Sequence, residues 1–208
     1  MGETADKIRA AATRLFAELG YAGTSVRAIC NAAGANLNGV SYHFAGKQGL
    51  YQAILSGIGD DRLASAQRLL GEPPRDLADL EARLLLFADE TLATHLKEPE
   101  LLVILYAESQ QRFRNCDPSA LENLGKHQEV LVAFLTAARR RSLLRKGIDL
   151  DIVAGGLLER LNNQVHFADL IASTYGTSIH DLEYRRHWTR QTIDLLLHGA
   201  SRPPSEDS

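Results

Sequence analysis

Apolar residues recur every three or four positions along this chain, and the residues that break helices fall between those stretches. Such spacing places apolar side chains on one face of an α-helix. In the first stretch these are Ile8, Ala11, Ala12, Leu15, Phe16 and Leu19. Glycines follow the periodic stretches at positions 20, 34, 46, 147, 176 and 199. The pattern therefore predicts a succession of helices packed on one side.

The composition supports helices over strands. The chain has 208 residues, with 33 Leu and 27 Ala but only 17 Val and Ile together. Leu and Ala keep their rotamer freedom in a helix, whereas β-branched residues favour strands. The sequence therefore predicts an all-α protein of about nine helices. We place them at 4–19, 26–33, 37–44, 47–70, 76–96, 99–113, 118–142, 149–175 and 181–198.

Several classes of protein are unlike this sequence. The longest wholly apolar stretch, Leu101 to Ala107, is shorter than the roughly 18–20 residues of a membrane span. Charged residues lie inside the first apolar pattern, which differs from a secretory signal segment. With only two cysteines, Cys30 and Cys116, a disulfide framework or a Cys-rich zinc module is not expected. We therefore expect a cytoplasmic protein with no membrane partner.

The charges are distributed unevenly between two predicted domains. Residues 1–55 carry five Lys/Arg against three Asp/Glu, whereas the remainder carries 18 against 23. A basic segment attached to an acidic body is typical of a small module that binds a polyanion. We expect a polyanion-binding module at 1–55, a separate body at 56–200, and a disordered tail at 201–208.

The segment from Thr24 to Phe44 carries the functional signal. Two short helices flank Gly34, which permits a sharp turn, while Val26, Ile29 and Ala33 face inward. The second helix directs Val40 and Phe44 inward and leaves polar residues outside. This pattern predicts a helix-turn-helix, whose second helix enters the DNA major groove. The outer residues are Asn36, Asn38, Ser41, Tyr42 and His43.

About 50 N-terminal residues resemble the DNA-binding domain of the TetR/AcrR family of bacterial transcriptional regulators. The matching elements keep the family's order and spacing. They are Gly20-Tyr21, Thr24-Ser25-Val26, Ile29, Ala32-Ala33-Gly34, Tyr42-His43-Phe44, Lys47 and Leu50. The resemblance implies an N-terminal three-helix DNA-binding domain, at residues 1–55, followed by a helical effector-binding and dimerisation domain, at residues 56–200.

The resemblance also implies roles for individual residues. Ser25, His43 and Lys47 would contact phosphates, Arg27 would approach a base edge, and Tyr42 would meet sugar, phosphate or a thymine methyl. This chain has Ser41 where the family usually has Tyr, and Leu37 where it often has Lys. The predicted DNA-contacting set is Ser25, Arg27, Asn36, Leu37, Asn38, Gly39, Ser41, Tyr42, His43 and Lys47.

The C-terminal part offers weaker signals. Aromatic and polar residues of its helices are candidates for an effector site: Phe87, Tyr106, Phe113, His127, Phe134 and His166. Two apolar faces predict a homodimer interface within residues 149–199. The first is formed by Leu150, Val153, Ala154, Leu157, Leu158, Leu161, Val165 and Ala168, and the second includes Trp188 and Leu195. No histidine pair has a recognisable ligand spacing, so we expect neither a metal site nor a cofactor.

These features predict a homodimeric, ligand-responsive transcription factor, most simply a repressor. It would bind a pseudo-palindromic double-stranded DNA operator and be released by a small-molecule effector of unknown identity. One alternative is a DNA-binding regulator without an effector. The other is a helical enzyme using His95, His127 or His166, which no nucleophile–base motif supports, so we expect no enzyme.

Overall fold

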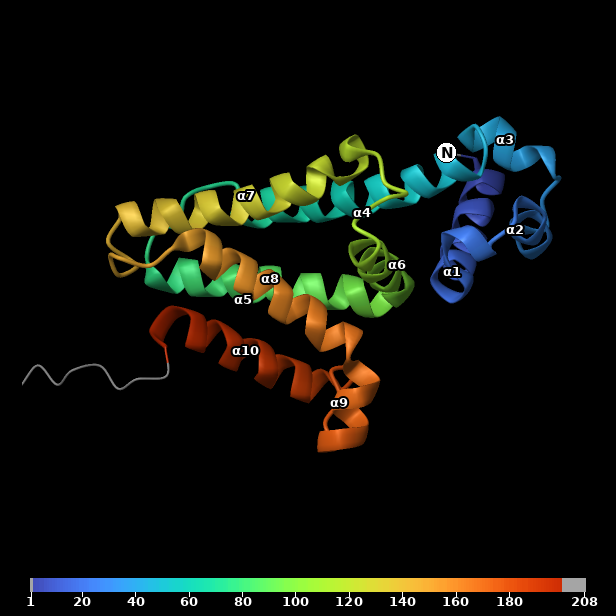
Figure 1. The fold of residues 1–208 in the computed structure, drawn as a ribbon. Helices are drawn as coiled ribbons and strands as arrows, with labels where there is room; N and C mark the ends of the chain where they lie inside the picture. The colour runs from blue at the N-terminus through green and yellow to red at the C-terminus, as the bar shows by residue number, and fades with distance from the viewer. Residues whose placement is uncertain (1, 200–208) are drawn as a thin grey trace, which may run out of the picture. The chain divides into compact units, whose positions relative to one another are not determined.

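The computed structural model describes residues 2–199, and this part of the chain folds into ten α-helices without a β-strand (Figure 1). The prediction of an all-α protein is confirmed. None of these helices has the length and apolar character that crossing a bilayer requires. The helices are α1 Glu3–Gly23, α2 Val26–Ala33, α3 Asn38–Phe44, α4 Lys47–Leu70, α5 Leu77–Lys97, α6 Pro99–Gln110, α7 Pro118–Arg140, α8 Leu150–His166, α9 Ala168–Tyr175 and α10 Leu182–His198.

The chain divides into two compact units, each made of two segments of sequence. The first unit comprises Met1–Ala64 and Lys97–His127, and the second comprises Ser65–Leu96 and Gln128–Ser208. The functional division into a DNA-binding domain at 1–55 and an effector and dimerisation domain at 56–200 stays a prediction. The tail predicted at 201–208 lies outside the described residues.

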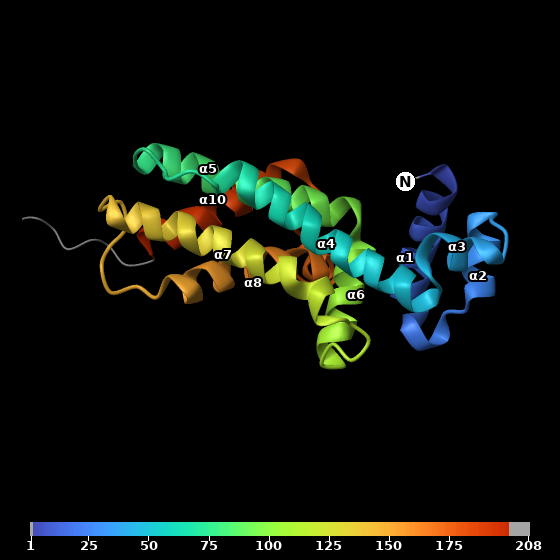
Figure 2. The same cartoon turned by 90° about the horizontal axis from the view of Figure 1, so that it is seen from above.

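In the first unit, α1 packs against both short helices, α2 and α3 (Figure 2). Helices of seven and eight residues bury little apolar surface alone, so α1 and the start of α4 supply most of their shared core. Ile29, Val40 and Phe44 are buried as the sequence predicted. The core also contains Ile8, Ala12, Phe16, Cys30, Leu50, Tyr51, Ile54, Leu55, Ile58 and Ile104.

The second unit buries apolar residues of α5, α7, α8 and α10. Six of the eight residues that the sequence assigned to a dimer face on the first of its two helices are buried within the chain itself. They are Leu150, Ala154, Leu157, Leu161, Val165 and Ala168. These residues of α8 and the first residue of α9 therefore belong to the core of the chain, and a dimer interface would have to use other residues.

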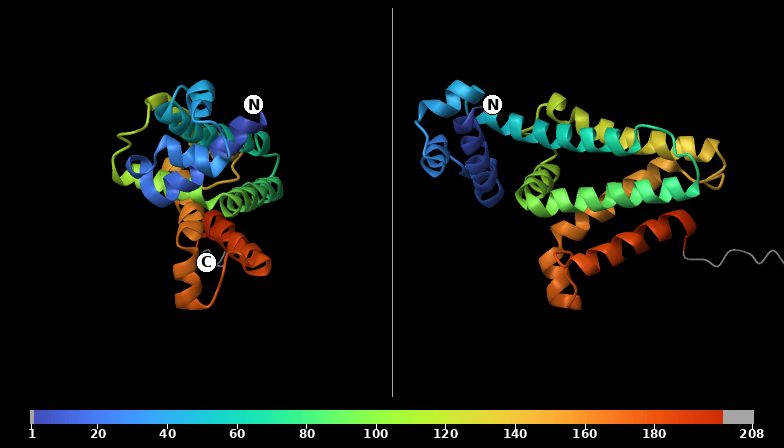
Figure 3. Two further views of the ribbon diagram at one scale, coloured as in Figure 1. Left: turned by 90° about the vertical axis from the view of Figure 1, so that its right-hand side faces the viewer. Right: turned by 180° about the vertical axis from the view of Figure 1, so that it is seen from behind.

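The predicted helix at 149–175 is wrong as a single helix. The chain leaves helical geometry at Phe167, where φ is −102° and ψ is 20°, so that α8 ends at His166 and α9 begins at Ala168. After this break α9 takes a different direction from α8 (Figures 1 and 3). Neither glycine nor proline marks the position, so tertiary packing overrides the local helix propensity here. The tenth helix results from this break.

Candidate nucleic-acid interface

The end of α1 is shaped by Gly20 and Thr24. Gly20 has a φ of 71°, which interrupts the helical geometry inside α1 at the position where the sequence predicted a helix end. A positive φ strains residues with a Cβ, so glycine suits this position. The Thr24 hydroxyl is buried and lies 3.0 Å from the carbonyl oxygen of Leu15 and 2.8 Å from that of Gly20. It thus satisfies carbonyls that the interrupted helix leaves unpaired.

Lys47, at the start of α4, fixes the connection between α1 and α2. Its ammonium donates to the carbonyl oxygens of Tyr21 at 2.7 Å and Thr24 at 2.8 Å. The same Nζ lies 4.3 Å from the centroid of the Tyr21 ring. An ammonium has three donors, so one remains for a further acceptor. Lys47 therefore holds α4 against the entrance to α2 whether or not it also contacts DNA.

The turn between α2 and α3 follows standard capping geometry. The Ser25 side chain accepts a hydrogen bond from the backbone N–H of Ala28 at 3.1 Å, which caps the start of α2. Gly34 ends α2 with a φ of 60°, and its N–H points to the carbonyls of Asn31 and Cys30. Ser25 and Arg27 are both exposed at this end of α2. The predicted helix-turn-helix is therefore present in the structure.

The outer face of α3 is polar and open to solvent. Asn36, Asn38, Ser41, Tyr42 and His43 are all exposed, and Tyr42 keeps 84% of its surface accessible. Because Val40 and Phe44 are buried on the opposite side, the helix cannot rotate to hide this face. The exposed face thus combines amide, hydroxyl and imidazole groups that can bond to base edges and phosphates.

The surroundings of Leu37, Asn36 and Gly39, at and near the start of α3, differ from one another. Leu37 precedes α3 and is 55% exposed. The Asn36 side-chain oxygen accepts from the backbone N–H of Asn38 at 3.0 Å, so it is already engaged at the start of the helix. Gly39 is half-buried, and a Cβ there would lie 3.0 Å from Cδ1 of Ile8, so this position permits α3 to approach α1 closely.

A buried carboxylate that the sequence analysis missed supports the α4 side of this interface. Glu108 of α6 is only 1% exposed, and its Oε1 accepts from the Tyr51 hydroxyl at 2.7 Å and from Nδ2 of Asn115 at 2.9 Å. Burial and the neighbouring Glu108 raise the pKa of Tyr51, and they raise the pKa of Cys116 to about 12. Both groups therefore stay protonated and serve as donors.

Gln52 adds a second link between α4 and the segment before α7. Its amide donates to the carbonyl of Asn115, and its Oε1 accepts from the backbone N–H of Asp117 at 2.9 Å.

The sequence contains a signal from which Glu108 could have been found. This residue occupies an inward position of α6, on the same helix face as Leu101 and Leu105. A charged residue on an apolar stripe indicates a buried polar network.

The six predicted effector residues are divided between the two units. Three belong to the first unit and three to the second: Tyr106, Phe113 and His127, and Phe87, Phe134 and His166. Phe87 and Phe134 are buried core residues. Burial of His127 lowers its pKa to about 4, and the positive charge of Arg62 lowers this pKa further in the same direction. Desolvation also lowers the pKa of Arg62 to about 10. The effector assignment of these residues stays a prediction.

Comparison with known proteins locates the likeness in the helix-turn-helix. Residues 8–54 match the family model of bacterial regulatory proteins, tetR family. Over 53 residues the chain is 45% identical to the "Probable HTH-type transcriptional regulator YttP" of Bacillus subtilis (strain 168). That alignment covers 26% of this chain and 26% of the relative, so it spans about a quarter of either protein.

Solved structures extend the likeness to the complete fold. The TetR family transcriptional regulator PfmR from Thermus thermophilus has a TM-score of 0.74 at 21% identity, over 97% of this chain and 100% of that chain. FadR from Bacillus subtilis, in complex with stearoyl-CoA, has a TM-score of 0.70 at 15% identity, over 94% and 99%. At such identities the likeness concerns the fold. Residues 8–54 therefore match the tetR family by sequence, as a helix-turn-helix DNA-binding domain, and the chain as a whole shares the fold of solved TetR family regulators.

Proposed function

We propose that this protein is a homodimeric, ligand-responsive repressor that reads a pseudo-palindromic operator with α3. The observation that carries the proposal is the exposed polar face of α3, fixed by the burial of Val40 and Phe44. A helix presented in this way by a helix-turn-helix enters the major groove, while the preceding helix lies across the backbone. As a cytoplasmic regulator, it would act by occupying DNA rather than by catalysis.

Within α3 we assign base reading to Asn38 and not to Asn36. The Asn36 side-chain oxygen accepts from the backbone N–H of Asn38, which holds this amide at the start of α3 and occupies one of the two lone pairs of its oxygen. Asn38 is exposed in the first turn of α3, from which recognition helices contact base edges. Ser25, Arg27, His43 and Lys47 would surround this contact and bind the backbone.

For dimerisation we propose the outer faces of α8 and α10. Ile152 on α8 is 73% exposed, and Phe167 and Leu195 also present large apolar surfaces. Between the helices lies a groove whose lining includes Gly156, Arg160, Phe167 and Trp188. A Cβ at Gly156 would have no atom within 4 Å, so this glycine leaves room for a second helix to approach. An identical chain would cover these apolar residues through an isologous interface.

A matched pair of variants tests this interface. Gly156→Glu introduces a charge at the groove without a clash inside the protomer, so we expect it to weaken dimerisation while the fold is retained. Gly125→Glu is the control, because a Cβ at Gly125 on α7 also has no atom within 4 Å. Sedimentation at micromolar concentration should show dimers for the wild type and the control. A wild-type monomer would refute the proposed interface.

The effector would be a small molecule that favours a conformation with low operator affinity. Linkage requires that such a molecule bind the free protein more tightly than the DNA complex. Among the proteins of similar fold, one FadR structure holds stearoyl-CoA, so acyl-CoA esters are a reasonable first set of compounds. Calorimetric titration with and without operator tests each compound, and equal affinities would exclude it as an inducer.

Selection of bound sequences from random double-stranded DNA tests the function as a whole. We expect enrichment of two inverted half-sites separated by one helical turn or a multiple of it. Repeating the selection with Asn38→Ala should remove the preference at one base pair in each half-site. Enrichment of no sequence, or of an asymmetric single site, would argue against a dimeric operator-reading repressor.

A further inference from the structure

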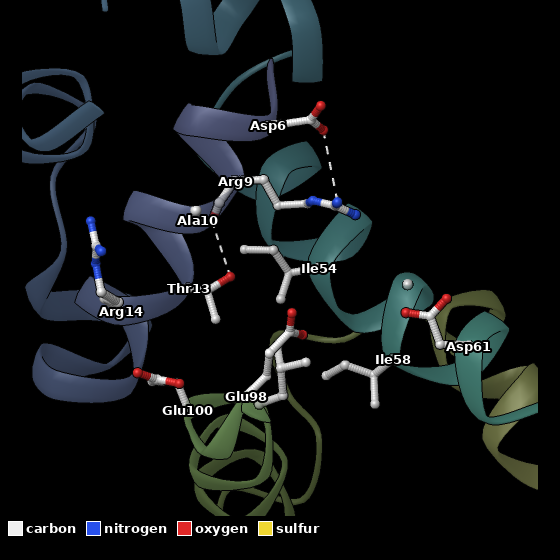
Figure 4. A pocket seen from close by; sticks show the side chains of 12 residues that line it. Asp6, Arg9, Ala10, Thr13, Arg14, Ile54, Ile58, Asp61, Glu98 and Glu100 are labelled. Carbon is white, nitrogen blue, oxygen red and sulfur yellow. Dashed lines mark hydrogen bonds and ion pairs between the residues drawn. The ribbon is translucent and has the colours of Figure 1, made fainter. Parts of the chain in front are cut away.

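A cavity of about 440 Å³ opens in the first unit among α1, α4 and the start of α6 (Figure 4). This volume is within the range of sites that hold small molecules. None of its lining residues belongs to the DNA-contacting set or to the effector set predicted from the sequence. The cavity is therefore a separate feature of the molecule.

The cavity has an apolar floor. Ile54 and Ile58 of α4 are buried, and Leu101 of α6 is partly buried beside them. Both isoleucine side chains point into the space between α1 and α6 (Figure 4). An apolar group placed against this floor would leave water, which favours binding in proportion to the area covered.

The rim of the cavity carries more negative than positive charge. It has four carboxylates, those of Asp6, Asp61, Glu98 and Glu100, and two guanidiniums. Among the described residues only Asp6 has a cation within 4.0 Å, which is Arg9 at 3.8 Å. The Glu98 carboxylate points between Thr13 and Ile54 (Figure 4). Three carboxylates thus face one cavity without an ion pair, an arrangement that a bound cation would stabilise.

Of two neighbouring groups, the Thr13 hydroxyl reinforces this preference and the start of α6 opposes it. The Thr13 hydroxyl donates to the carbonyl of Arg9 at 3.0 Å, which leaves its lone pairs as acceptors. The start of α6 has a positive dipole end, but Glu98 and Glu100 already provide negative charge there. No group of three or more His, Cys, Asp or Glu in residues 2–199 is arranged to hold a metal ion. The chemistry therefore favours an organic cation over a metal.

We infer that this cavity binds a small organic cation with an apolar body, such as a primary amine on an aromatic or aliphatic group. The apolar body would lie on Ile54, Ile58 and Leu101, and the amine would bond to the carboxylates of Glu98 and Asp61. Such a ligand would contact α1, α4 and α6 together. Because α1 supports α2 and α3, binding would stabilise the arrangement that presents the DNA-reading helix.

A set of four probes tests the chemistry of the site by calorimetry on the full chain without DNA. 2-Phenylethylamine has both the cation and the apolar ring. 2-Phenylethanol lacks the charge, phenylacetate reverses it, and putrescine lacks the ring. We expect 2-phenylethylamine to bind at least about tenfold more tightly than each of the others. Equal binding of the amine and the alcohol, or no binding of the amine at millimolar concentration, would overturn the proposal.

Substitution of a helical glycine tests the location. A Cβ at Gly57, on the wall formed by α4, would be 3.9 Å from Nη1 of Arg9, its nearest neighbour. Gly57→Leu should therefore fill the cavity and abolish amine binding while raising Tm, because Leu is the better helix former. Gly125→Leu, on the same unit but outside the cavity, should raise Tm and leave binding unchanged. Unchanged binding in a folded Gly57→Leu variant would place the amine elsewhere.

A second pair of variants tests the carboxylates. Glu98→Gln combined with Asp61→Asn should weaken amine binding at least about tenfold and leave that of 2-phenylethanol unchanged. Glu18→Gln removes an exposed carboxylate of α1 that does not line the cavity, so it should have no effect. None of these measurements involves the operator, so the cation site and the repressor function can fail independently. An equal loss in Glu18→Gln would indicate a non-specific effect of net charge.

Discussion

The two units of this protein differ in the interactions that fix their structure. In the first unit, polar side chains have specific partners: Thr24 and Lys47 bind carbonyls around the end of α1, and Tyr51 donates to the buried Glu108. The second unit has a core of buried leucines from α5, α7 and α8, and its side-chain hydrogen bonds include Arg83 to the carbonyl of Leu69 at 2.7 Å. Its buried Thr189 and Thr192 hydroxyls have no hydrogen-bond partner among the described residues.

Part of the polar network of the first unit lies within the segment that resembles known proteins. A hydrogen bond requires a particular group at a particular distance, whereas apolar burial accepts many side chains of similar volume. The family model matches residues 8–54, which contain Thr24 and Lys47, whereas solved structures share the fold over 97% of the chain at 21% identity. The comparison predicts that single substitutions in the first unit have larger effects on stability and DNA binding than substitutions in the second unit.

The largest effect is expected at Gly49 in the first turn of α4. A Cβ there would lie 1.8 Å from the carbonyl oxygen of Phe44, so the end of α3 would have to move. Gly49→Ala should lower the free energy of unfolding by about 3 kcal/mol or more. Urea denaturation measures this change, and operator binding should weaken with it because α3 is displaced.

Gly125→Ala is the matched control for Gly49→Ala. Gly125 lies on α7, where a Cβ would have no atom within 4 Å. This variant should raise the free energy of unfolding by up to about 1 kcal/mol, since Ala is the better helix former. Equal destabilisation in both variants would mean that the close contact between α3 and α4 is not the cause.

The next effect concerns the pH dependence of stability in the first unit. Burial lowers the pKa of His127 to about 4, below its usual 6.5, so the unfolded chain binds this proton more tightly. The stability that neutral His127 provides is complete above pH 6.5 and is lost as the pH falls towards 4. We expect a loss of about 2–3 kcal/mol across this window. Urea denaturation of His127→Gln should show a smaller loss, and an unchanged pH dependence would contradict the assignment.

Much of the helical order follows from the sequence because glycines and apolar periodicity determine helix ends locally. The helix predicted at 47–70 has the same bounds in the structure, and α2, α3 and α10 agree within one residue. The exposed set on α3 was also predictable, because Val40 and Phe44 leave only one orientation for a short helix. These features depend on residues close together in the sequence.

The remaining features depend on contacts between distant residues. The break at Phe167 has no local signal, and from the sequence the burial of α8 within its own chain cannot be separated from burial in a dimer interface. The cavity between α1, α4 and α6 combines Arg9, Ile54 and Glu98, which no sequence spacing links. Similarly, hydrogen bonding of Lys47 to Tyr21 and Thr24 emerges only when α4 packs beside α1.

A smaller effect on stability is expected at Lys47, a residue that links α4 to α1 and is also predicted to contact DNA. Lys47→Ala removes two hydrogen bonds from a charged donor, so it should cost about 1–3 kcal/mol of stability. If the third ammonium donor reaches a phosphate, the salt dependence of DNA binding should fall by about one charge per half-site. Binding to operator and scrambled DNA at several salt concentrations measures this. An altered base preference with an unchanged salt slope would mean that the proposed docking is wrong.

The smallest effect on stability is expected at Asn38. This position tests whether side chains on the outer face of α3 contribute to folding. Its side chain is exposed and has no hydrogen bond in the described residues, whereas its backbone N–H binds Asn36. Asn38→Ala should therefore leave the free energy of unfolding within about 0.5 kcal/mol of the wild type. Binding should lose about 1–3 kcal/mol at one base pair of each half-site, because a bidentate contact to adenine is removed. Affinity for scrambled DNA and the salt slope should stay unchanged, since no phosphate contact is lost.

Asn36→Ala provides the comparison. It removes the acceptor at the start of α3, so it should lower the free energy of unfolding and leave the base preference unchanged. If Asn36→Ala changed the preferred base and Asn38→Ala did not, the reading role would belong to Asn36 and α3 would dock on DNA in a different register.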